Sequence, residues 1–304
     1  MLVYPKAQTK WLWIIAAYLF LAGVGGGAYL LGVAADLIGG EQWTFLSKAG
    51  IILGFPCVAI GAALLIFDLG TPKNFWRAAM KPGTSWMARG VIILSIFMIL
   101  GVIHIAFWIW PFPNVLEGAE GARQILSIVG AVFALAVMIY TGLLLEASRP
   151  IAFWGAAILP ELFLVSALST GLMGVVLIGS IGGAAKTTIL TFEKIYILLN
   201  VFELIALGFF MQATHRVTES RISAELVLRG AVAPLFWFGV VIVGLIVPLV
   251  LVILDVTILG GTVAPIAASI CALIGGLFLR EVILAGGVHA PLKAGRFEYM
   301  LTNV

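Results

Sequence analysis

The strongest constraint on the fold is a set of eight long apolar runs. A helix needs about 20 consecutive, mostly apolar residues to cross the hydrocarbon core of a bilayer, and membrane-barrel strands are much shorter than these runs. The runs cover roughly residues 11–36, 49–69, 90–110, 124–146, 158–183, 192–213, 232–254 and 263–285. The sequence therefore predicts an all-α membrane protein with eight transmembrane helices.

The composition agrees with this prediction. Charged residues make up 10% of the 304 residues, whereas soluble proteins carry about 25%. So few charges cannot cover a water-facing surface, and the bilayer must be the solvent for most of the chain. The longest links between runs, 70–89 and 214–231, have room for short interfacial helices but not for a soluble domain.

A weak internal similarity divides the eight runs into two groups of four. "LFLAGVGGG" at 19–27 belongs to the first run and "LFLVSALSTG" at 162–171 to the fifth. Both follow an apolar triplet with small residues, and the spacing of Gly23 and Gly27 favours close helix packing. We therefore expect two four-helix bundles, residues 1–150 and 151–304.

The cations are distributed unequally between the two sides of the predicted bundle. Eight spans return the chain to the side on which it began. Only four of the 17 Lys and Arg residues fall on the other side: Lys48, Arg123, Lys186 and Lys194. The positive-inside rule then places both termini in the cytoplasm.

Histidine and cysteine are too few for the usual redox centres of a membrane protein. A b-type haem needs two facing histidines, but of His104, His215 and His289 only His104 lies well inside a run. Zinc and iron–sulfur sites need about four ligands, and the two cysteines cannot supply them. We expect no haem, iron–sulfur cluster or metal, and we interpret His104 as a hydrogen-bonded packing residue.

Polar residues in the first half gather in one leaflet. Tyr18 lies about 10 Å in from the terminal side at 1.5 Å per residue, and Tyr140 lies at about the same depth. Asp68 ends the second run on that side, and Glu146 lies nearer the surface. These residues predict a polar pocket, or else tyrosines anchored at the interface and acids that neighbour loop cations.

The second half has a polar face of its own. Glu193, Tyr196, Asn200 and Glu203 fall at i, i+3, i+7 and i+10, on one side of a helix. Polar groups inside a span are costly and usually functional. Two interpretations stay open: interhelical hydrogen bonds with one buried ion pair, or a partial proton path, whose candidates are Glu161, Asn200, Glu203, Arg280 and Glu281.

Several motifs together resemble the NrfD/polysulfide reductase membrane-subunit family. The resemblance covers roughly residues 11–171, and the C-terminal half matches mainly in span count. It rests on "YLFLAGVGGGAYLLG" from 18, "DLGTPKNFW" from 68, "SW" at 85–86, "YTGLLLEASRPIAFW" from 140 and "LPELFLVSALSTG" from 159.

The resemblance implies a function. Members of this family are haem-free subunits of respiratory complexes in the prokaryotic inner membrane and are not catalytic alone. They bind a quinone (menaquinone or ubiquinone) in the first bundle. They exchange electrons with a ferredoxin-like iron–sulfur subunit that connects to a molybdenum enzyme or a multihaem cytochrome. Many relatives serve exported enzymes, so partner docking could also explain the cations on the terminal side.

The same resemblance implies roles for particular residues. Tyr18, Asp68 and Tyr140 would bind the quinone, with Tyr18 at a place where some relatives have histidine or asparagine. A quinone head group needs a polar donor for each carbonyl and an apolar opening for its tail. The loop after the second run would dock the partner through Lys73, Trp76, Arg77 and Trp86, since tryptophan and arginine are common interface anchors.

Two other functions remain possible from the residues. A secondary transporter would have similar halves and polar groups near the midplane, which the motif similarity and Glu203 favour. A purely structural anchor would bind no quinone at all.

Overall fold

The computed structural model describes residues 13–68, 80, 82–83, 85–109, 118–148, 150–289, 292–294 and 297–299. Within these residues, eight helical segments are long and apolar enough to cross a membrane. Seven are single helices: α1 (Trp13–Ile38), α2 (Thr44–Asp68), α3 (Trp86–Ala106), α5 (Glu120–Glu146), α6 (Leu159–Ile181), α7 (Lys186–Arg216) and α10 (Val263–Ala285). The all-α fold with eight spans is confirmed.

The seventh span is built from three consecutive segments. The π-helical segment η3 (Leu235–Ile246) leads into α9 (Val247–Leu254), and a π-helical turn η4 (Asp255–Leu259) ends it. Gly260 then adopts a left-handed conformation with φ 57°, which glycine allows at little cost. The sequence predicts the span but not its wider helical winding.

Three shorter elements lie between or after the spans. A 3₁₀ turn, η1 (Glu41–Trp43), leads into α2. The 214–231 link holds a short helix, α8 (Thr218–Arg229), as the room in that link allows. Near the C-terminus, β1 (Leu292–Ala294) and β2 (Phe297–Tyr299) form an antiparallel pair that the sequence did not lead us to expect.

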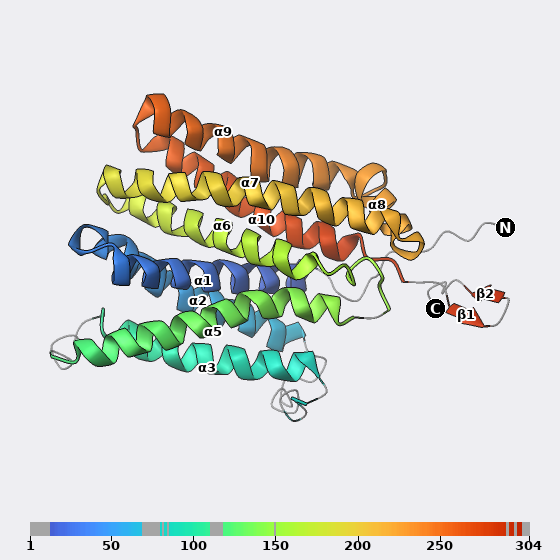
Figure 1. The fold of residues 1–304 in the computed structure, drawn as a ribbon, viewed down its shortest axis with the longest axis horizontal. Helices are drawn as coiled ribbons and strands as arrows, with labels where there is room; N and C mark the ends of the chain where they lie inside the picture. Colours follow the sequence, from blue (N-terminus) through green and yellow to red (C-terminus); the bar gives the residue numbers. More distant parts are fainter. Residues whose placement is uncertain are drawn as a thin grey trace.

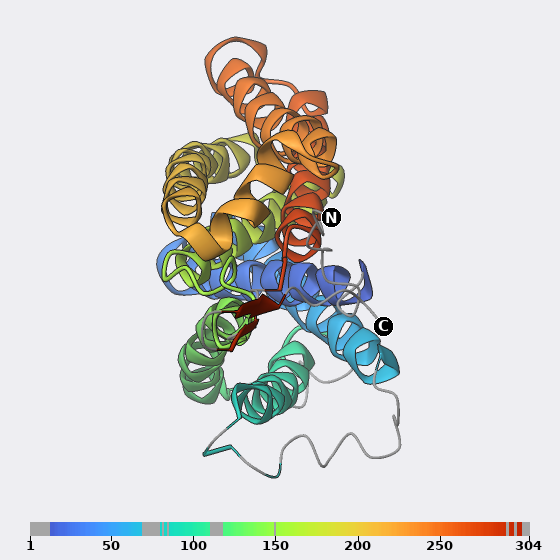
Figure 2. The same ribbon diagram turned by 90° about the vertical axis from the view of Figure 1, so that its right-hand side faces the viewer.

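The spans run side by side along the long axis of the molecule (Figure 1). α1 and α6 lie in the middle, with α2, α3 and α5 on one side and α7, the seventh span and α10 on the other (Figures 1 and 2). α1 begins and α10 ends at the same end of the bundle, which we call the terminal end. Lys186 and Asp255 lie at the opposite end.

Glycines explain how closely α1 and α6 approach. A Cβ atom on Gly27 would collide with the carbonyl oxygen of Ala167, and one on Gly171 would collide with the amide nitrogen of Ala28. These two helices are also the most buried of the eight spans. The small-residue face expected from Gly23 and Gly27 therefore lies at the contact between α1 and α6.

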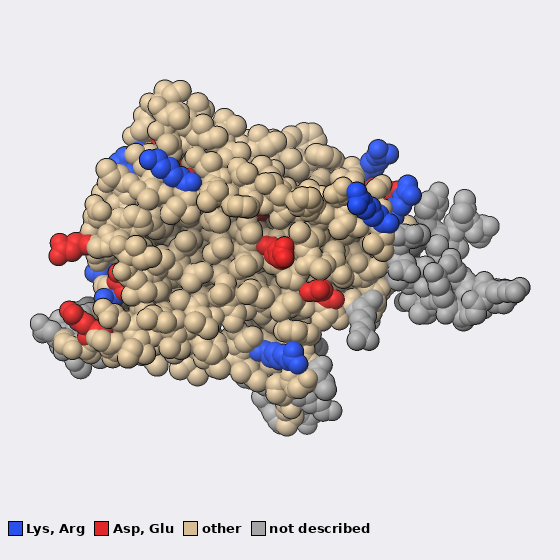
Figure 3. Space-filling view, viewed as in Figure 1, with Lys and Arg blue, Asp and Glu red and all other residues tan. Residues whose placement is uncertain are grey.

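The surface matches a protein surrounded by lipid. Figure 3 shows a face that is mostly uncharged, with most Lys and Arg side chains towards the ends of the helices. Large apolar side chains such as Ile99, Leu198, Phe209 and Phe238 are exposed. In a bilayer these side chains contact acyl chains rather than water.

Candidate functional site

Two tyrosines from different helices meet near the terminal end of the first half. Tyr18 of α1 is 0% exposed and Tyr140 of α5 is 1% exposed. Their phenols lie near each other, but the two hydroxyls do not meet in hydrogen-bonding geometry. The structure therefore brings together the two residues that the sequence placed at the same depth.

Glycines on the two neighbouring helices leave room for these rings. A Cβ atom on Gly61 of α2 would lie 3.5 Å from Cδ2 of Tyr18. A Cβ atom on Gly90 of α3 would collide with the phenol of Tyr140. All four helices of the first half therefore contribute to one site, and Gly90 is not replaceable without displacing Tyr140.

Neither tyrosine hydroxyl is satisfied by the residues that the structure describes. Among the described residues, the Tyr18 and Tyr140 hydroxyls have no hydrogen-bond partner. A buried polar group left unpaired costs about 1–3 kcal/mol. Such a cost is commonly retained where a ligand or water completes the site.

The other predicted quinone residue lies further out. Asp68 is the last residue of α2 and is exposed. It follows Gly61, the glycine beside Tyr18, by seven residues, which is about 10 Å along a helix. The structure thus places Asp68 at the surface of the terminal end and gives it no contact with either phenol.

The predicted docking loop is only partly described. Lys73, Trp76 and Arg77 lie outside the described residues. Trp86 begins α3 and is half-buried, with the Arg89 guanidinium 4.6 Å from its ring centre. Arg89 also donates hydrogen bonds to the carbonyls of Pro82 (2.8 Å) and Gly83 (3.1 Å), which fixes the entry into α3.

A second polar group lies deeper in the first half, towards the opposite end. His104 Nδ1 lies 2.7 Å from the Tyr29 hydroxyl, and Nε2 lies 3.2 Å from Ser127 Oγ. Ser127 donates to the Arg123 carbonyl (2.9 Å), so it accepts from Nε2–H and Tyr29 donates to Nδ1. His104 is thus hydrogen-bonded on both nitrogens, as predicted.

Charged side chains cluster at the opposite end of the first half. Asp36 and Arg123 form an ion pair between α1 and α5. Arg123 and Lys48 both lie over the Trp108 ring, at 5.0 and 4.9 Å from its centre. Asp36 therefore forms its ion pair at the other end of α1 from Tyr18 and does not belong to the tyrosine site.

The second half contains a buried arginine and a buried glutamate. Arg280 is 1% exposed and donates to Ser166 Oγ (2.5 Å) and the Gly276 carbonyl (3.1 Å). Glu203 is 3% exposed and interacts with Ser166, Ser169 and Arg280. Among the described residues, Arg280 forms no direct salt bridge. Ser166, which contacts both Arg280 and Glu203, therefore links the two charges.

Arg280 also reaches the first half. A Cβ atom on Gly23 of α1 would lie 3.3 Å from Arg280 Nη2. The guanidinium therefore lies where α1, α6 and α10 meet, and its Nε has no hydrogen-bond partner among the described residues. The absence of a side chain at Gly23 is what gives it this space.

A third charged group marks the opposite end of the second half. Asp255 is 2% exposed and ion-paired with Lys186, and it accepts a hydrogen bond from the Gly261 amide (3.0 Å). Glu193 is 0% exposed and interacts with both charges. Neither of its carboxylate oxygens has a hydrogen-bond partner among the described residues.

Our sequence reasoning missed Asp255 and Lys186 as members of this group. The available signal was a single acid inside an apolar run, in "VILDVTIL".

Further along α7, Asn200 donates to the Tyr196 hydroxyl (2.8 Å), while its own Oδ1 has no partner within the described residues.

The two remaining proton-path candidates lie apart from this group. Glu161 is exposed in the first turn of α6, where it lines a cleft of about 460 Å³ with Thr214 and Ser220. Glu281 of α10 is partly buried.

In the described part of the sequence, no three His, Cys, Asp or Glu side chains are grouped to hold a metal ion.

Comparison with known proteins places the protein among membrane subunits of reductases. Residues 4–291 match the family described as "Polysulphide reductase, NrfD". A subunit of the polysulfide reductase of Wolinella succinogenes is 31% identical over 266 residues, covering 79% of this sequence and 82% of the relative. An NrfD homologue of Haemophilus influenzae is 30% identical, covering 81% and 84%. A subunit of the selenate reductase of Mesobacillus selenatarsenatis is 23% identical, covering 94% and 75%.

Proposed function

Because this protein belongs to the polysulphide reductase NrfD family, we propose that it is the quinone-reactive membrane subunit of a respiratory reductase complex. Relatives named as subunits of polysulfide and selenate reductases support the subunit role. In this proposal the protein is not catalytic alone. It exchanges electrons between a menaquinone or ubiquinone pool and an iron–sulfur partner subunit.

The pair of buried, unpartnered phenols carries the quinone proposal, because neither hydroxyl has a partner among the described residues. A quinone head group has two carbonyl oxygens that accept hydrogen bonds, and Tyr18 and Tyr140 offer one hydroxyl donor each. The surrounding helices are apolar, which suits the ring and the isoprenoid tail. The donor set therefore fits the group.

Proton transfer would be the chemical task of these residues. When bound, the quinone supplies a carrier that takes up two electrons and two protons and becomes a quinol. Tyr18 and Tyr140 hold protons at neighbouring hydroxyls in a buried site. Asp68, exposed at the same end, stays a predicted route between these protons and water.

The partner would dock at the terminal end, since Tyr18 and Tyr140 lie nearest to it. The start of α3, with Trp86 and Arg89, offers an aromatic and cationic surface there. The partner is an iron–sulfur subunit of the ferredoxin-like class, joined in turn to a molybdenum enzyme or multihaem cytochrome. By the positive-inside count, this end faces the cytoplasm of a prokaryotic inner membrane.

Gentle purification from the native membrane tests the proposal. We expect an iron–sulfur subunit to co-purify with the protein and extraction of the same sample to release a quinone. A lone polypeptide without quinone would contradict the proposal, and substrate-dependent uptake by that polypeptide would favour a transporter. A complete complex that reacts with quinone only through another subunit would leave this protein as an anchor.

Proton conduction through the second half is a further candidate function. The observation that favours it is the buried carboxylate of Glu193, unpartnered among the described residues and lying beside Asp255 and Lys186. From Glu193, polar residues continue along α7 through Asn200 to Glu203. Glu203 interacts with Arg280 of α10, whose guanidinium lies beside α1. Glu161 and Glu281 stay predicted contributors at the terminal end. Buried ionisable groups inside spans commonly mark such paths.

Glu193→Gln separates proton movement from quinone chemistry. We expect the variant complex to keep its quinone reactivity in detergent and to lose most proton movement across sealed vesicles, because glutamine cannot bind and release a proton. The measurement is the pH change per electron transferred. Glu120→Gln, an exposed acid at the same end, is the matched control. Unchanged proton movement in Glu193→Gln would exclude this path.

A further inference from the structure

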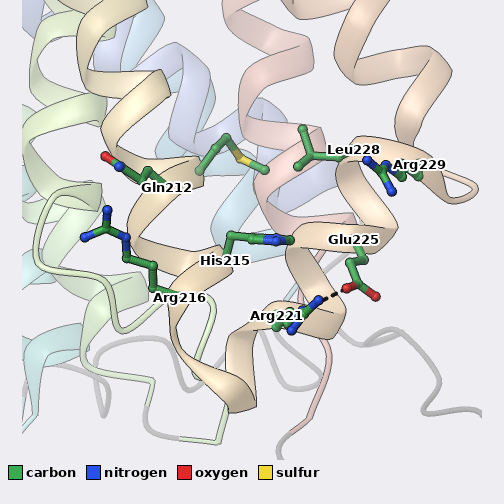
Figure 4. A pocket seen from close by; sticks show the side chains of 8 residues that line it. Gln212, His215, Arg216, Arg221, Glu225, Leu228 and Arg229 are labelled. Atoms are coloured by element: carbon green, nitrogen blue, oxygen red, sulfur yellow. Dashed lines mark hydrogen bonds and ion pairs between the residues drawn. The ribbon is translucent and has the colours of Figure 1, made fainter.

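The two ends of α7 carry charged side chains that differ in burial. At the terminal end, Figure 4 shows Arg216 and Arg229 on opposite sides of α7, while Arg221 pairs with Glu225 of α8. All four side chains are exposed, so water stabilises their charges and they do not form one site. The charged side chains at the opposite end of α7 are different, because they are mostly buried and meet one another.

Three charged residues meet at the opposite end. Lys186 begins α7, Glu193 follows it by seven residues, and Asp255 begins η4. Seven residues are about two helical turns, so Glu193 lies on the same face of α7 as Lys186 and about 10 Å further along the helix. The proton proposal gives Glu193 a task but gives none to Asp255 or Lys186.

Exposure to water falls from Lys186 to Glu193. The Lys186 side chain is 28% exposed, whereas the Asp255 side chain and Glu193 are both 0% exposed. Asp255 forms an ion pair with Lys186 and interacts with Glu193. Lys186 and Glu193 form no ion pair with each other. Asp255 therefore connects Glu193 with the one side chain of the three that reaches water.

The turn after η4 holds Asp255 in place. The Gly261 amide donates a hydrogen bond to Asp255 Oδ1 (3.0 Å), while the ion pair with Lys186 uses Oδ2. Lys186 Nζ also donates to the Gly261 carbonyl (2.6 Å). If Nζ moved away from Oδ2, Oδ1 would stay bonded and Oδ2 would be free. Oδ2 is thus the atom at which Asp255 can accept a proton.

The surrounding elements add no further charge to this group. α9 and the first turn of α10 contain no charged residue. Glu41 of η1 and Lys194 of α7 are exposed, and the Tyr196 hydroxyl is hydrogen-bonded to Asn200. Within the described residues, the charges that act on Glu193 are those of the other two members of the group.

Two buried acids therefore share one cation. A buried carboxylate is stable as an anion only when it is paired, and one ammonium group neutralises one carboxylate. The group must then hold one proton besides the charge of Lys186. The ion pair assigns the negative charge to Asp255 and the proton to Glu193, whose carboxylate oxygens have no hydrogen-bond partner among the described residues.

We propose that Lys186 gates proton exchange between Glu193 and the water at the opposite end, with Asp255 as the intermediate carrier. The inference rests on the proposed proton path through the second half. As Lys186 leaves Asp255, the proton moves from the Glu193 carboxyl to Asp255 Oδ2, and the negative charge passes to Glu193. Lys186 follows this charge on its flexible four-carbon stem. Asp255 then releases the proton to water, and Lys186 returns to it.

The same steps in reverse take up a proton from water. While Lys186 occupies Oδ2, Asp255 accepts no proton from either side, so the path and the water are not connected. A lysine suits this task because its ammonium is strongly hydrated and is held by a stem with several rotatable bonds. Its position at the first residue of α7 keeps the ammonium within reach of water.

Proton movement by the complete complex in sealed vesicles tests this gate. We expect Lys186→Gln to keep its quinone reactivity in detergent and to lose most of its proton movement per electron. Without the lysine, the buried Asp255 stays protonated and accepts nothing from Glu193. Raising the pH at the opposite end should restore part of the movement, since Asp255 then loses its proton to water. Lys186→Arg keeps the positive charge and should retain most of the movement.

Lys194→Gln is the matched control, because it removes an exposed cation of the same helix and should move protons like the wild type. Normal movement in Lys186→Gln beside a loss in Glu193→Gln would overturn the gate and leave the path. Normal movement in Glu193→Gln would remove the path and the gate with it. An equal loss in Lys186→Gln and Lys186→Arg at every pH would also overturn the gate, since the lysine would then be needed only for structure.

A double variant keeps the test decisive if Lys186→Gln does not assemble. Lys186→Gln/Asp255→Asn removes both members of the ion pair and leaves neither charge unpaired. Its assembled fraction and thermal stability are measured on the same sample. We expect the double variant to lose its proton movement, because asparagine cannot carry a proton between Glu193 and water. Movement like that of the wild type would contradict the role of Asp255 and Lys186.

Discussion

Replacing Tyr140 by phenylalanine is expected to lower the rate of quinone reduction by a factor of roughly 10²–10⁴, the usual contribution of a positioned proton donor. The substitution removes only a hydroxyl. Because that hydroxyl has no partner among the described residues, its loss breaks no hydrogen bond with them. The measurement is steady-state quinone reduction by the complete complex, with the assembled fraction and thermal stability measured on the same sample.

Tyr29→Phe is the control for this prediction. Tyr29 is an equally buried tyrosine of α1, but its hydroxyl is hydrogen-bonded to His104 Nδ1. Its loss leaves a buried histidine nitrogen unpaired and should cost about 1–3 kcal/mol of stability while quinone reduction stays near the wild-type rate. A Tyr140→Phe complex that is fully active, or no more impaired than Tyr29→Phe, would remove Tyr140 from the quinone site.

Gly27→Ala is expected to destabilise the protein by about 3 kcal/mol, the upper end of the usual cost of overpacking. The new Cβ would collide with the carbonyl oxygen of Ala167. A backbone carbonyl cannot rotate out of the way as a flexible side group does, so α1 and α6 must separate. The measurement is the thermal unfolding midpoint of the purified complex and its yield of folded material.

Gly208→Ala is the matched substitution. Gly208 lies inside α7, and a Cβ atom there would meet no described residue. Alanine at this position improves helix propensity by up to about 1 kcal/mol. Its unfolding midpoint should equal or exceed that of the wild type. Equal stability of the two variants would mean that the α1–α6 contact tolerates a wider spacing than the structure has.

The eight spans and the depth of the two tyrosines could be predicted because both depend on distances along one helix. Bilayer thickness fixes the length of an apolar run, and the constant rise per residue sets Tyr18 and Tyr140 at one level. Their direct approach across α1 and α5 also needs Gly61 and Gly90 to leave room. That requirement is visible only once the helices are packed.

The charged group at Glu193 could not be predicted because it depends on rotation and on long-range contact. Asp255 and Lys186 are 69 residues apart and meet only when the seventh span lies beside α7. In helices that are apolar on every side, the side that faces a neighbour leaves little trace in the sequence. Asp68 illustrates the same limit: its depth follows from its position, but its exposure does not.

The α1–α6 contact has a consequence for how the two halves can move. Transporters that alternate access move one bundle against the other about a central site. Here such movement would pull apart backbone surfaces that meet at Gly27 and Gly171. It would also draw the buried Arg280 guanidinium of α10 away from Gly23 of α1. The environment of the buried arginine therefore depends on the position of α1, which agrees better with the proposed quinone role than with a transporter.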